Sequence, residues 1–236
     1  MTWSAVRAEA LTRLVEWNNR RVRWVDPSPP NPLPIDHEPW CRALQAAHPA
    51  ILGEWRRFVA DGGRLPLIES LLDGPQGNVG GWWRAGGLIV EGRPRGPLAR
   101  EFPETVAALS TIPGLLSAMW SVLGPGAELP PHTGTNAGAL NLLVGVDCPP
   151  GSGHDIEGVP VSLDGGAVVI FDDTYRHSAW NQSDRPRVLL IGGVLRPVPG
   201  MAGHLNAAVQ RAHHRLSPQY HRAIDVGAEL HHALNE

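Results

Sequence analysis

The hydrophobic pattern divides the chain into a helical beginning, a strand-rich middle and a helical end. Apolar residues recur at spacings of three and four over 4–24 and again over 39–62, which is the periodicity of helices with one buried face. Five prolines between residues 26 and 34 separate these two helical segments and predict an extended, stiff strap. Helical spacing returns from Met201 onward. We therefore predict helices that flank a central domain.

The middle of the chain consists of short apolar runs separated by glycine, proline and aspartate. The predicted strands are 87–90, 115–123, 139–146, 159–163, 167–171 and 188–195, with a short helix beginning at Phe102. The turn Asp164–Gly166 predicts a hairpin between its two neighbouring runs, because Asp-Gly turns suit paired antiparallel strands. Short strands at this spacing favour a mainly β jelly roll. We expect an N-terminal helix and strap over 1–37, a jelly-roll domain over 38–200 and a C-terminal helical extension over 201–236.

Composition narrows the class of protein and its partners. The 236 residues are 42% hydrophobic and 18% charged, which is typical of a globular protein. The formal net charge of −3 provides no basic field for nucleic acid or an anionic membrane, so neither is an expected partner. Cys41 and Cys148 cannot form a disulfide framework. No signal peptide or long apolar run is visible, so we expect a soluble cytoplasmic protein.

Two histidines and an arginine stand near predicted strand ends. His132 and His177 are 45 residues apart, a separation at which a jelly roll can bring two strand ends to one mouth of the barrel. Arg187 lies on the next predicted strand. Two imidazoles can hold a divalent iron and an arginine can bind a carboxylate with two hydrogen bonds, which is the layout of iron- and 2-oxoglutarate-dependent oxygenases. The alternative is two structural histidines and a surface arginine. Six histidines of the C-terminal segment are interpreted as lying on solvated helix faces: His204, His213, His214, His221, His231 and His232.

Linked motifs over about residues 81–197 resemble the aspartyl/asparaginyl β-hydroxylase family. They are Phe102-Pro-Glu-Thr-Val106, Ser121-Val-Leu-Gly-Pro-Gly126, Pro131-His-Thr-Gly-Thr-Asn136, Phe171-Asp-Asp-Thr-Tyr-Arg-His177 with Trp180, and Arg187. Several motifs in the same order are more specific than a pair of histidines alone.

The resemblance implies a double-stranded β-helix that uses Fe(II), 2-oxoglutarate as cosubstrate, and dioxygen. His132 and His177 match the two iron ligands of the family. Arg187 and Ser121 match residues at the distal carboxylate of 2-oxoglutarate, and Asp173 matches an acidic residue near the metal. These roles are implied by the resemblance and are expectations for this chain.

Three positions depart from common patterns. Gly134 stands two residues after His132, where most enzymes of this class carry a coordinating carboxylate, although the family often has glycine there with water in the open position. That opening leaves an iron halogenase as an alternative. Asn141 replaces an arginine that holds the substrate carboxylate, and Leu143 replaces a histidine at the metal-proximal carboxylate of the cosubstrate, for which Arg185 is a substitute candidate.

The expected reaction is hydroxylation of an unactivated C–H bond in a free amino acid, a carrier-bound amino acid or a small peptide. Trp82, Trp83 and Trp180 are candidates for lining the pocket, with core packing as the alternative. A cupin-like metalloenzyme that does not use 2-oxoglutarate and a non-catalytic barrel remain alternative functions. The strap and the C-terminal helices could cap the site or form the interface of a homodimer. Substrate identity and stereochemistry are left open.

Overall fold

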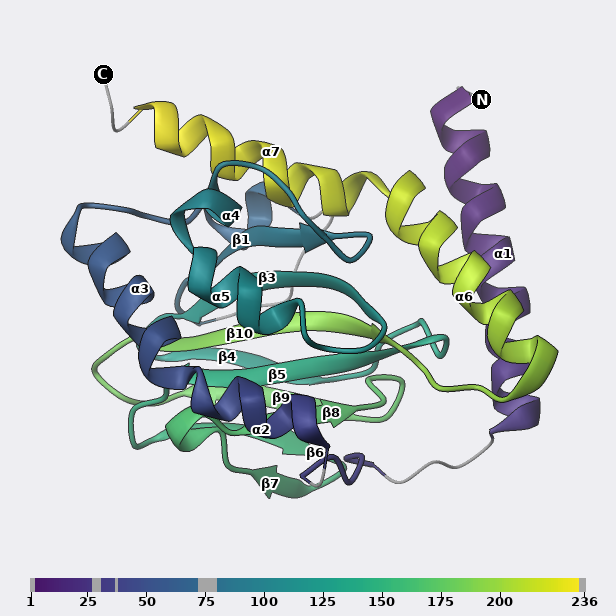
Figure 1. Ribbon diagram of the computed structural model, residues 1–236, viewed down its shortest axis with the longest axis horizontal. Coiled ribbons are helices and arrows are strands. Elements are labelled where there is room, and N and C mark those ends of the chain that lie inside the picture. Colours follow the sequence, from purple (N-terminus) through teal and green to yellow (C-terminus); the bar gives the residue numbers. More distant parts are fainter. Residues whose placement is uncertain (1–2, 27–30, 37, 72–79, 234–236) are drawn as a thin grey trace.

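The computed structural model describes residues 3–26, 31–36, 38–71 and 80–233, and within it helices flank two β-sheets (Figure 1). The helices are α1 (Trp3–Val25), α2 (Pro39–Ala46), α3 (His48–Ala60), α4 (Leu98–Glu101), α5 (Pro103–Leu109), α6 (Gly200–Leu216) and α7 (Pro218–Ala233). The strands are β1 (Trp83–Val90), β2 (Arg93–Pro94), β3 (Leu115–Leu123), β4 (Ala127–His132), β5 (Ala139–Asp147), β6 (Ser152–Ile156), β7 (Val159–Val161), β8 (Val168–Phe171), β9 (His177–Asn181) and β10 (Arg187–Leu195).

The strand order identifies the predicted jelly roll. The larger sheet has the order β2-β1-β3-β10-β5-β8 and the smaller sheet the order β4-β9-β6-β7, with every pair antiparallel. From β3 to β10 the chain crosses between the sheets at each step, apart from the β6–β7 hairpin. This alternation forms a double-stranded β-helix, and it confirms the predicted mainly β fold with flanking helices.

The predicted hairpin around Asp164–Gly166 is wrong. Its first strand, β7, pairs with β6 in the smaller sheet, whereas β8 pairs with β5 in the larger sheet. Between them Gly165 and Gly166 have φ angles of 60° and 82°, within a short 3-10 turn. A Cβ on Gly166 would lie 2.7 Å from the Cβ of His48 at the start of α3. The two glycines therefore form a tight corner between the sheets instead of a hairpin turn.

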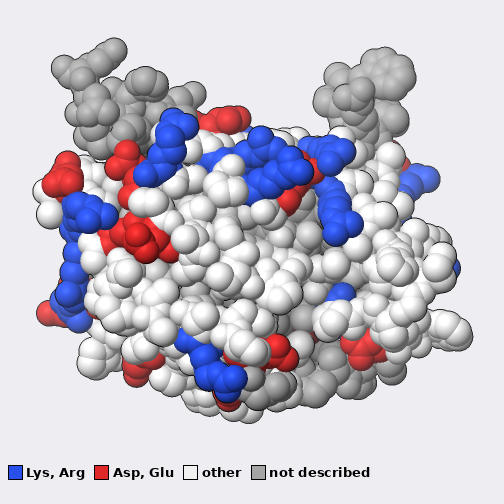
Figure 2. Space-filling view, viewed as in Figure 1, with Lys and Arg blue, Asp and Glu red and all other residues white. Residues whose placement is uncertain are grey.

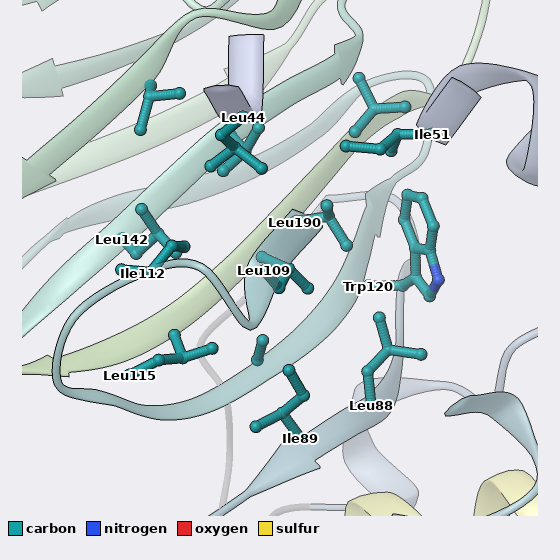
Figure 3. Packing of buried hydrophobic residues seen from close by; sticks show 14 of the residues in the cluster. Leu44, Ile51, Leu88, Ile89, Leu109, Ile112, Leu115, Trp120, Leu142 and Leu190 are labelled. Atoms are coloured by element: carbon teal, nitrogen blue, oxygen red, sulfur yellow. The ribbon is translucent and has the colours of Figure 1, made fainter. Parts of the chain in front are cut away.

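The main hydrophobic core lies between the larger sheet and helices α2, α3 and α5. Trp120, Leu142 and Leu190 from three adjacent strands pack there with Leu44 and Ile51 from the helices (Figure 3). Because side chains alternate along a strand, the intervening positions of the same strands face the inside of the barrel. The larger sheet therefore has one face in the core and one face lining the barrel.

The N-terminal helix buries only part of the face that apolar spacing predicts, since Val15 of that face is buried. Leu14 and Trp17 are 37% and 38% exposed, whereas Asn18 is buried on the side facing α6. The Asn18 side-chain amide donates a hydrogen bond of 2.8 Å to the Oδ1 atom of Asn206 on α6. Val22 is also buried. A polar contact between α1 and α6 therefore helps to set the orientation of α1. The expected division of the chain at residues 37 and 200 stays a prediction.

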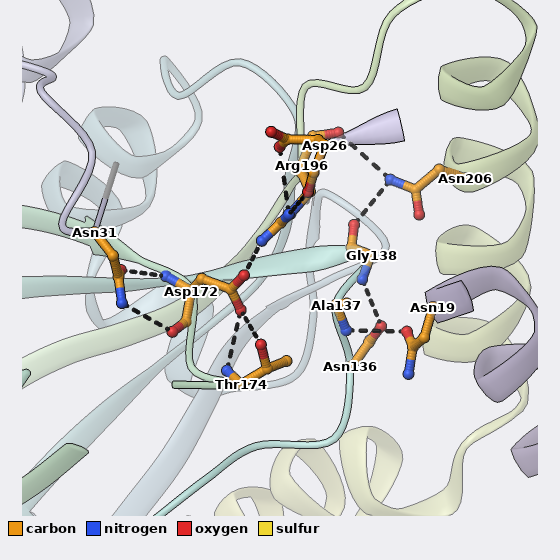
Figure 4. A network of polar contacts seen from close by, with 10 residues as sticks. All are labelled: Asn19, Asp26, Asn31, Asn136, Ala137, Gly138, Asp172, Thr174, Arg196 and Asn206. Atoms are coloured by element: carbon orange, nitrogen blue, oxygen red, sulfur yellow. Dashed lines mark hydrogen bonds and ion pairs between the residues drawn. The ribbon is translucent and has the colours of Figure 1, made fainter. Parts of the chain in front are cut away.

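A buried ion-pair network joins the described part of the strap to the barrel (Figure 4). Arg196, which follows β10 and is 2% exposed, pairs with Asp172 and with Asp26 at the end of α1. Asp172 also accepts hydrogen bonds from the backbone and hydroxyl of Thr174. The side chain of Asn31 accepts a 2.9 Å bond from the Asp172 backbone N–H. These bonds hold the loop between β8 and β9, which ends at His177.

The surface charges agree with the small net charge. On the face shown in Figure 2, arginines and acidic side chains are interspersed around a broad area that carries neither. Among the described helices, none is long and apolar enough to cross a membrane.

Candidate active site

Strands β4 and β9 place His132 beside His177. The two residues are paired across the antiparallel ladder, and their ring centroids are 4.2 Å apart. The Nδ1–H of His132 donates to the Pro130 carbonyl at 2.8 Å, and that of His177 donates to the Tyr175 carbonyl at 3.0 Å. A carbonyl can only accept, so each Nδ1 carries the proton and each Nε2 keeps a lone pair. Burial lowers the pKa of His177. Two imidazoles that engage carbonyls through Nδ1 and keep Nε2 for a ligand fit a divalent metal ion.

The carboxylate of Asp173 occupies the space beside Gly134. A Cβ built on Gly134 would lie 2.4 Å from the Asp173 carboxyl carbon, and the Gly134 N–H donates to the Asp173 carbonyl at 2.6 Å. Burial raises the pKa of Asp173 to about 6, an effect that Asp172 reinforces. Within the described residues, no group of three His, Cys, Asp or Glu side chains is placed to hold a metal. Asp173 therefore suits a hydrogen bond to metal-bound water better than direct coordination.

Arg187 is a buried cation near the other end of the barrel. It begins β10, its Nη1 donates to the Gly153 carbonyl at 2.6 Å, and its buried Nε has no hydrogen-bond partner. Burial lowers its pKa to about 10, so the guanidinium stays charged at neutral pH. In the described part of the chain no carboxylate forms an ion pair with it. A buried guanidinium without an anion fits a carboxylate ligand.

Ser121 is oriented by one of the candidate tryptophans. The indole N–H of Trp83 donates to Ser121 Oγ at 2.9 Å. The serine oxygen already accepts one bond, so its own O–H is available to donate to a ligand. Ser121 pairs with Leu189, which lies two residues after Arg187 on β10 and on the same side of the strand. Trp83 thus does not line the barrel itself but orients the serine hydroxyl that does.

His154 is a further buried histidine beside His177, and nothing in the sequence singled it out. It lies on β6, its ring is 6.0 Å from that of His177 and nearly parallel to it, and Phe171 contacts it edge-on at 5.5 Å. Burial, reinforced by Arg187, lowers its pKa to about 3. The surrounding Gly-Ser-Gly-His-Asp sequence is typical of a loop, so the pattern carried no signal of an inward-facing strand position.

A cavity of about 170 Å³ lies where α6 and α7 cover one end of the barrel. Asn141, Asp173 and Met119 line its barrel side, and His214 and Tyr220 line its helical side. The prediction of a solvated face is wrong for His214, which is 1% exposed and stacks on Tyr220 at 4.2 Å, because α6 packs against β3 and β10. The cavity places the predicted residues Asn141 and Asp173 together.

Two of the candidate tryptophans lie outside the barrel. Trp82 and Arg185 line a separate cavity of about 510 Å³ between α3 and the beginnings of β1 and β10. Trp180 lies over Gly153, whose Cβ would be 2.2 Å from the indole, on the face of the smaller sheet opposite His177. Strand alternation therefore directs Trp180 away from the barrel. Arg185 is more than half exposed and lies 3.9 Å from Asp147, so it does not replace Leu143 inside the barrel.

The burial of His214 predicts a pH dependence of stability. Burial lowers its folded pKa to about 4 from 6.5, so between these pH values the unfolded chain binds the proton more readily and stability is lost as pH falls. At pH 4.5 the loss from this group is on the order of 2–3 kcal/mol. Urea unfolding at pH 7.5 and 4.5 should show a smaller pH effect in His214→Gln than in the wild type. His204→Gln, on the exposed side of α6, is the matched control, and parallel pH profiles for the wild type and H214Q would contradict the prediction.

Comparison with known proteins gives one family match and one curated relative. The family model described as Aspartyl/Asparaginyl beta-hydroxylase matches residues 45–197. An ornithine lipid ester-linked acyl 2-hydroxylase of Rhizobium tropici is 30% identical over 179 residues, covering 72% of this chain and 62% of that protein. The chain thus spans less than two thirds of the relative's length.

Similar solved structures are more distant. A prolyl-4-hydroxylase of Pseudomonas putida has a TM-score of 0.44 and 16% identity, covering 64% of this chain and 88% of its own. An oxidoreductase of the 2OG-Fe(II) oxygenase family from Burkholderia pseudomallei has a TM-score of 0.35 and 13% identity, with coverage of 66% and 92%.

Proposed function

Because the chain belongs to the aspartyl/asparaginyl β-hydroxylase family, we propose that it is an Fe(II)- and 2-oxoglutarate-dependent dioxygenase that hydroxylates an unactivated C–H bond. The observation that carries the proposal is the His132–His177 pair, in which both Nδ1 atoms are engaged by carbonyls and both Nε2 atoms are free to bind metal. The unpaired Arg187 supports it, because a keto acid that chelates the metal needs an anchor for its far carboxylate.

The residues divide the work between binding and positioning. His132 and His177 would hold the iron, which with 2-oxoglutarate supplies the power to oxidise a C–H bond by dioxygen. Arg187 and the Ser121 hydroxyl would hold the distal carboxylate. Asp173, beside Gly134, would accept a hydrogen bond from water at the open metal position. His214 of α6 and Tyr220 of α7 would form the wall of the cavity opposite Asn141 and Asp173.

The cavity favours an acyl group over a free amino acid. Its lining combines apolar side chains such as Met119 and Ile191 with uncharged polar groups and Asp173, and no arginine is among the described lining residues. The carboxylate of a free amino acid would have no cation to balance its charge there. We therefore propose an acyl or aminoacyl group joined to a larger molecule by an ester or amide bond. The name of the Rhizobium tropici relative, an acyl 2-hydroxylase, supports the acyl version.

Succinate release tests this proposal. Anaerobically purified protein is given Fe(II), ascorbate, 2-oxoglutarate and air, with free amino acids, short peptides or an ester-linked acylated amino acid lipid. We expect the acylated compound to raise succinate release and to gain one oxygen by mass spectrometry. Metal binding without 2-oxoglutarate turnover would favour the cupin-like alternative, and a chlorinated product in chloride buffer would indicate a halogenase. If a free amino acid raised succinate release more than the acylated compound, the proposed substrate class would be wrong, whereas the proposed dioxygenase reaction would stand.

Arg187→Met is expected to weaken 2-oxoglutarate binding while leaving the metal site intact. A charged, bidentate hydrogen-bonded pair contributes roughly 1.5–3 kcal/mol, so the apparent KM for 2-oxoglutarate should rise about 10- to 100-fold. Iron content after reconstitution should match the wild type. Arg185→Met is the control, because that side chain lies outside the barrel. Equal KM values for R187M and R185M would show that Arg187 does not anchor the cosubstrate.

A further inference from the structure

His154 is an unpartnered polar side chain inside the barrel. It is 6% exposed, and neither ring nitrogen has a hydrogen-bond partner among the described residues. Trp180 covers the outer face of Gly153, the preceding residue of β6, so His154 lies on the opposite face of the strand. Ile156, two residues further on, lies on the same face as His154 and packs with Phe171 and Leu189. The imidazole therefore points inward. A buried polar group without a partner is costly and rare, unless a ligand or water completes its hydrogen bonds.

The backbone places His154 next to the Arg187 guanidinium. Arg187 Nη1 donates to the carbonyl of Gly153, the residue that precedes His154. Arg187 Nε is also buried without a partner, so unsatisfied polar groups from two strands meet in one region of the barrel. A cation and a neutral imidazole, both with unused N–H groups, match the two oxygens of one carboxylate.

A structural or metal-binding role explains His154 less well. A histidine kept for structure usually engages a carbonyl, as His177 does with Tyr175 and His214 with Gln210. His154 makes no such bond in the described structure. It does not form a three-ligand group with His132 and His177 either, since no group of three metal-ligand side chains is found in the described part of the chain.

We propose that His154 is a cosubstrate-binding residue, which donates a ring N–H to the same distal carboxylate of 2-oxoglutarate that Arg187 holds. This inference rests on the proposed function and adds a binding residue to it. The His154 ring faces that of His177 at 6.0 Å, and Arg187 bonds to the carbonyl of the residue before His154, so the imidazole neighbours both the histidine pair and the arginine. The low pKa of His154 agrees with a neutral donor.

Binding measurements with a redox-inert metal test the inference without turnover. Mn(II)-loaded protein is titrated anaerobically with 2-oxoglutarate, and with 2-oxobutyrate, which keeps the keto acid and lacks the distal carboxylate. We expect His154→Leu to weaken 2-oxoglutarate binding about 10-fold or more, in line with the loss of a hydrogen bond to a charged group. Binding of 2-oxobutyrate and of Mn(II) should change less than about twofold, because neither involves the distal carboxylate. His154→Gln, which keeps an N–H donor, should recover part of the lost affinity.

The outcomes separate the two proposals. If the wild-type Mn(II) protein does not bind 2-oxoglutarate, the proposed function fails, and the role of His154 fails with it. If the wild type binds and H154L binds equally well, only the role of His154 is wrong. Equal losses for 2-oxoglutarate and 2-oxobutyrate would place His154 at the metal end and also overturn it. If H154L does not fold, His154→Met, which also removes the N–H donor, is compared with H154Q by the ratio of the two affinities, and a ratio in H154M equal to that of the wild type would overturn the role of His154.

Discussion

His132→Ala is expected to abolish iron binding and hydroxylation. The described residues offer two imidazoles and no third protein ligand in metal-binding geometry, so removal of one leaves a single donor. Loss of groups that merely orient a ligand typically costs 10- to 100-fold in metal affinity, so loss of a ligand should cost about 100-fold or more. Metal content after anaerobic reconstitution and succinate release with substrate are the two measurements.

The position of His132 makes this variant a clean test. The side chain of His132 is exposed whereas that of His177 is buried, so H132A should keep the thermal stability of the wild type better than His177→Ala. His204→Ala, on an exposed position of α6, is the matched control and should retain iron and turnover. An H132A protein that binds iron and releases succinate like H204A would show that the metal site lies elsewhere.

Arg196→Met is expected to destabilise the fold by about 3–5 kcal/mol, because it leaves a buried carboxylate without its cation. Arg196 pairs with Asp172 inside the protein and with Asp26 at the end of α1, and both Arg196 and Asp172 are almost fully buried. In the variant, Thr174 still donates two hydrogen bonds to the Asp172 carboxylate, but these uncharged groups cannot neutralise its negative charge. Urea unfolding at pH 7.5 measures the change in free energy.

Two comparisons identify the cause of that loss. Arg215→Met removes an exposed arginine paired with Glu91 at 2.8 Å and should cost less than about 1 kcal/mol. The double variant D172N/R196M should recover part of the stability, because it also removes the uncompensated charge. If R196M were as stable as R215M, the buried network would not support the loop that leads to His177.

Local patterns were sufficient for the long apolar strands of the larger sheet, whereas β4, β6 and β9 of the smaller sheet were not among the predicted strands. The runs 115–123 and 188–195 coincide with β3 and, apart from its first residue, β10, because β-branched and leucine side chains there alternate between two buried faces. The helical segment 39–62 was also predicted with the correct buried side, although a break at Ala47 divides it into α2 and α3. Such features depend on neighbours a few residues apart, which the sequence displays directly.

Predictions failed where distant segments decide the environment of a residue. The Asp164–Gly166 turn satisfies the local rule for a hairpin. In the structure, however, β8 forms its backbone hydrogen bonds with β5 of the larger sheet, and β7 pairs with β6 of the smaller sheet. Likewise only part of the apolar stripe of α1 is buried: Leu14 and Trp17 are partly exposed, because α6 presents Asn206 to the neighbouring asparagine side of that helix. In both cases a contact with another part of the chain overrode a local preference.

By itself the sequence determined the fold class, through the spacing of its apolar runs, and the residue types available for chemistry at His132, His177 and Arg187. Only the tertiary structure decided the register in which β4 meets β9, and so the 4.2 Å approach of the two rings. It also decided that Trp180 faces outward and that His154 lies unpartnered beside Arg187. Strand register and burial arise from hydrogen bonds and packing between segments far apart in the chain, which no local pattern contains.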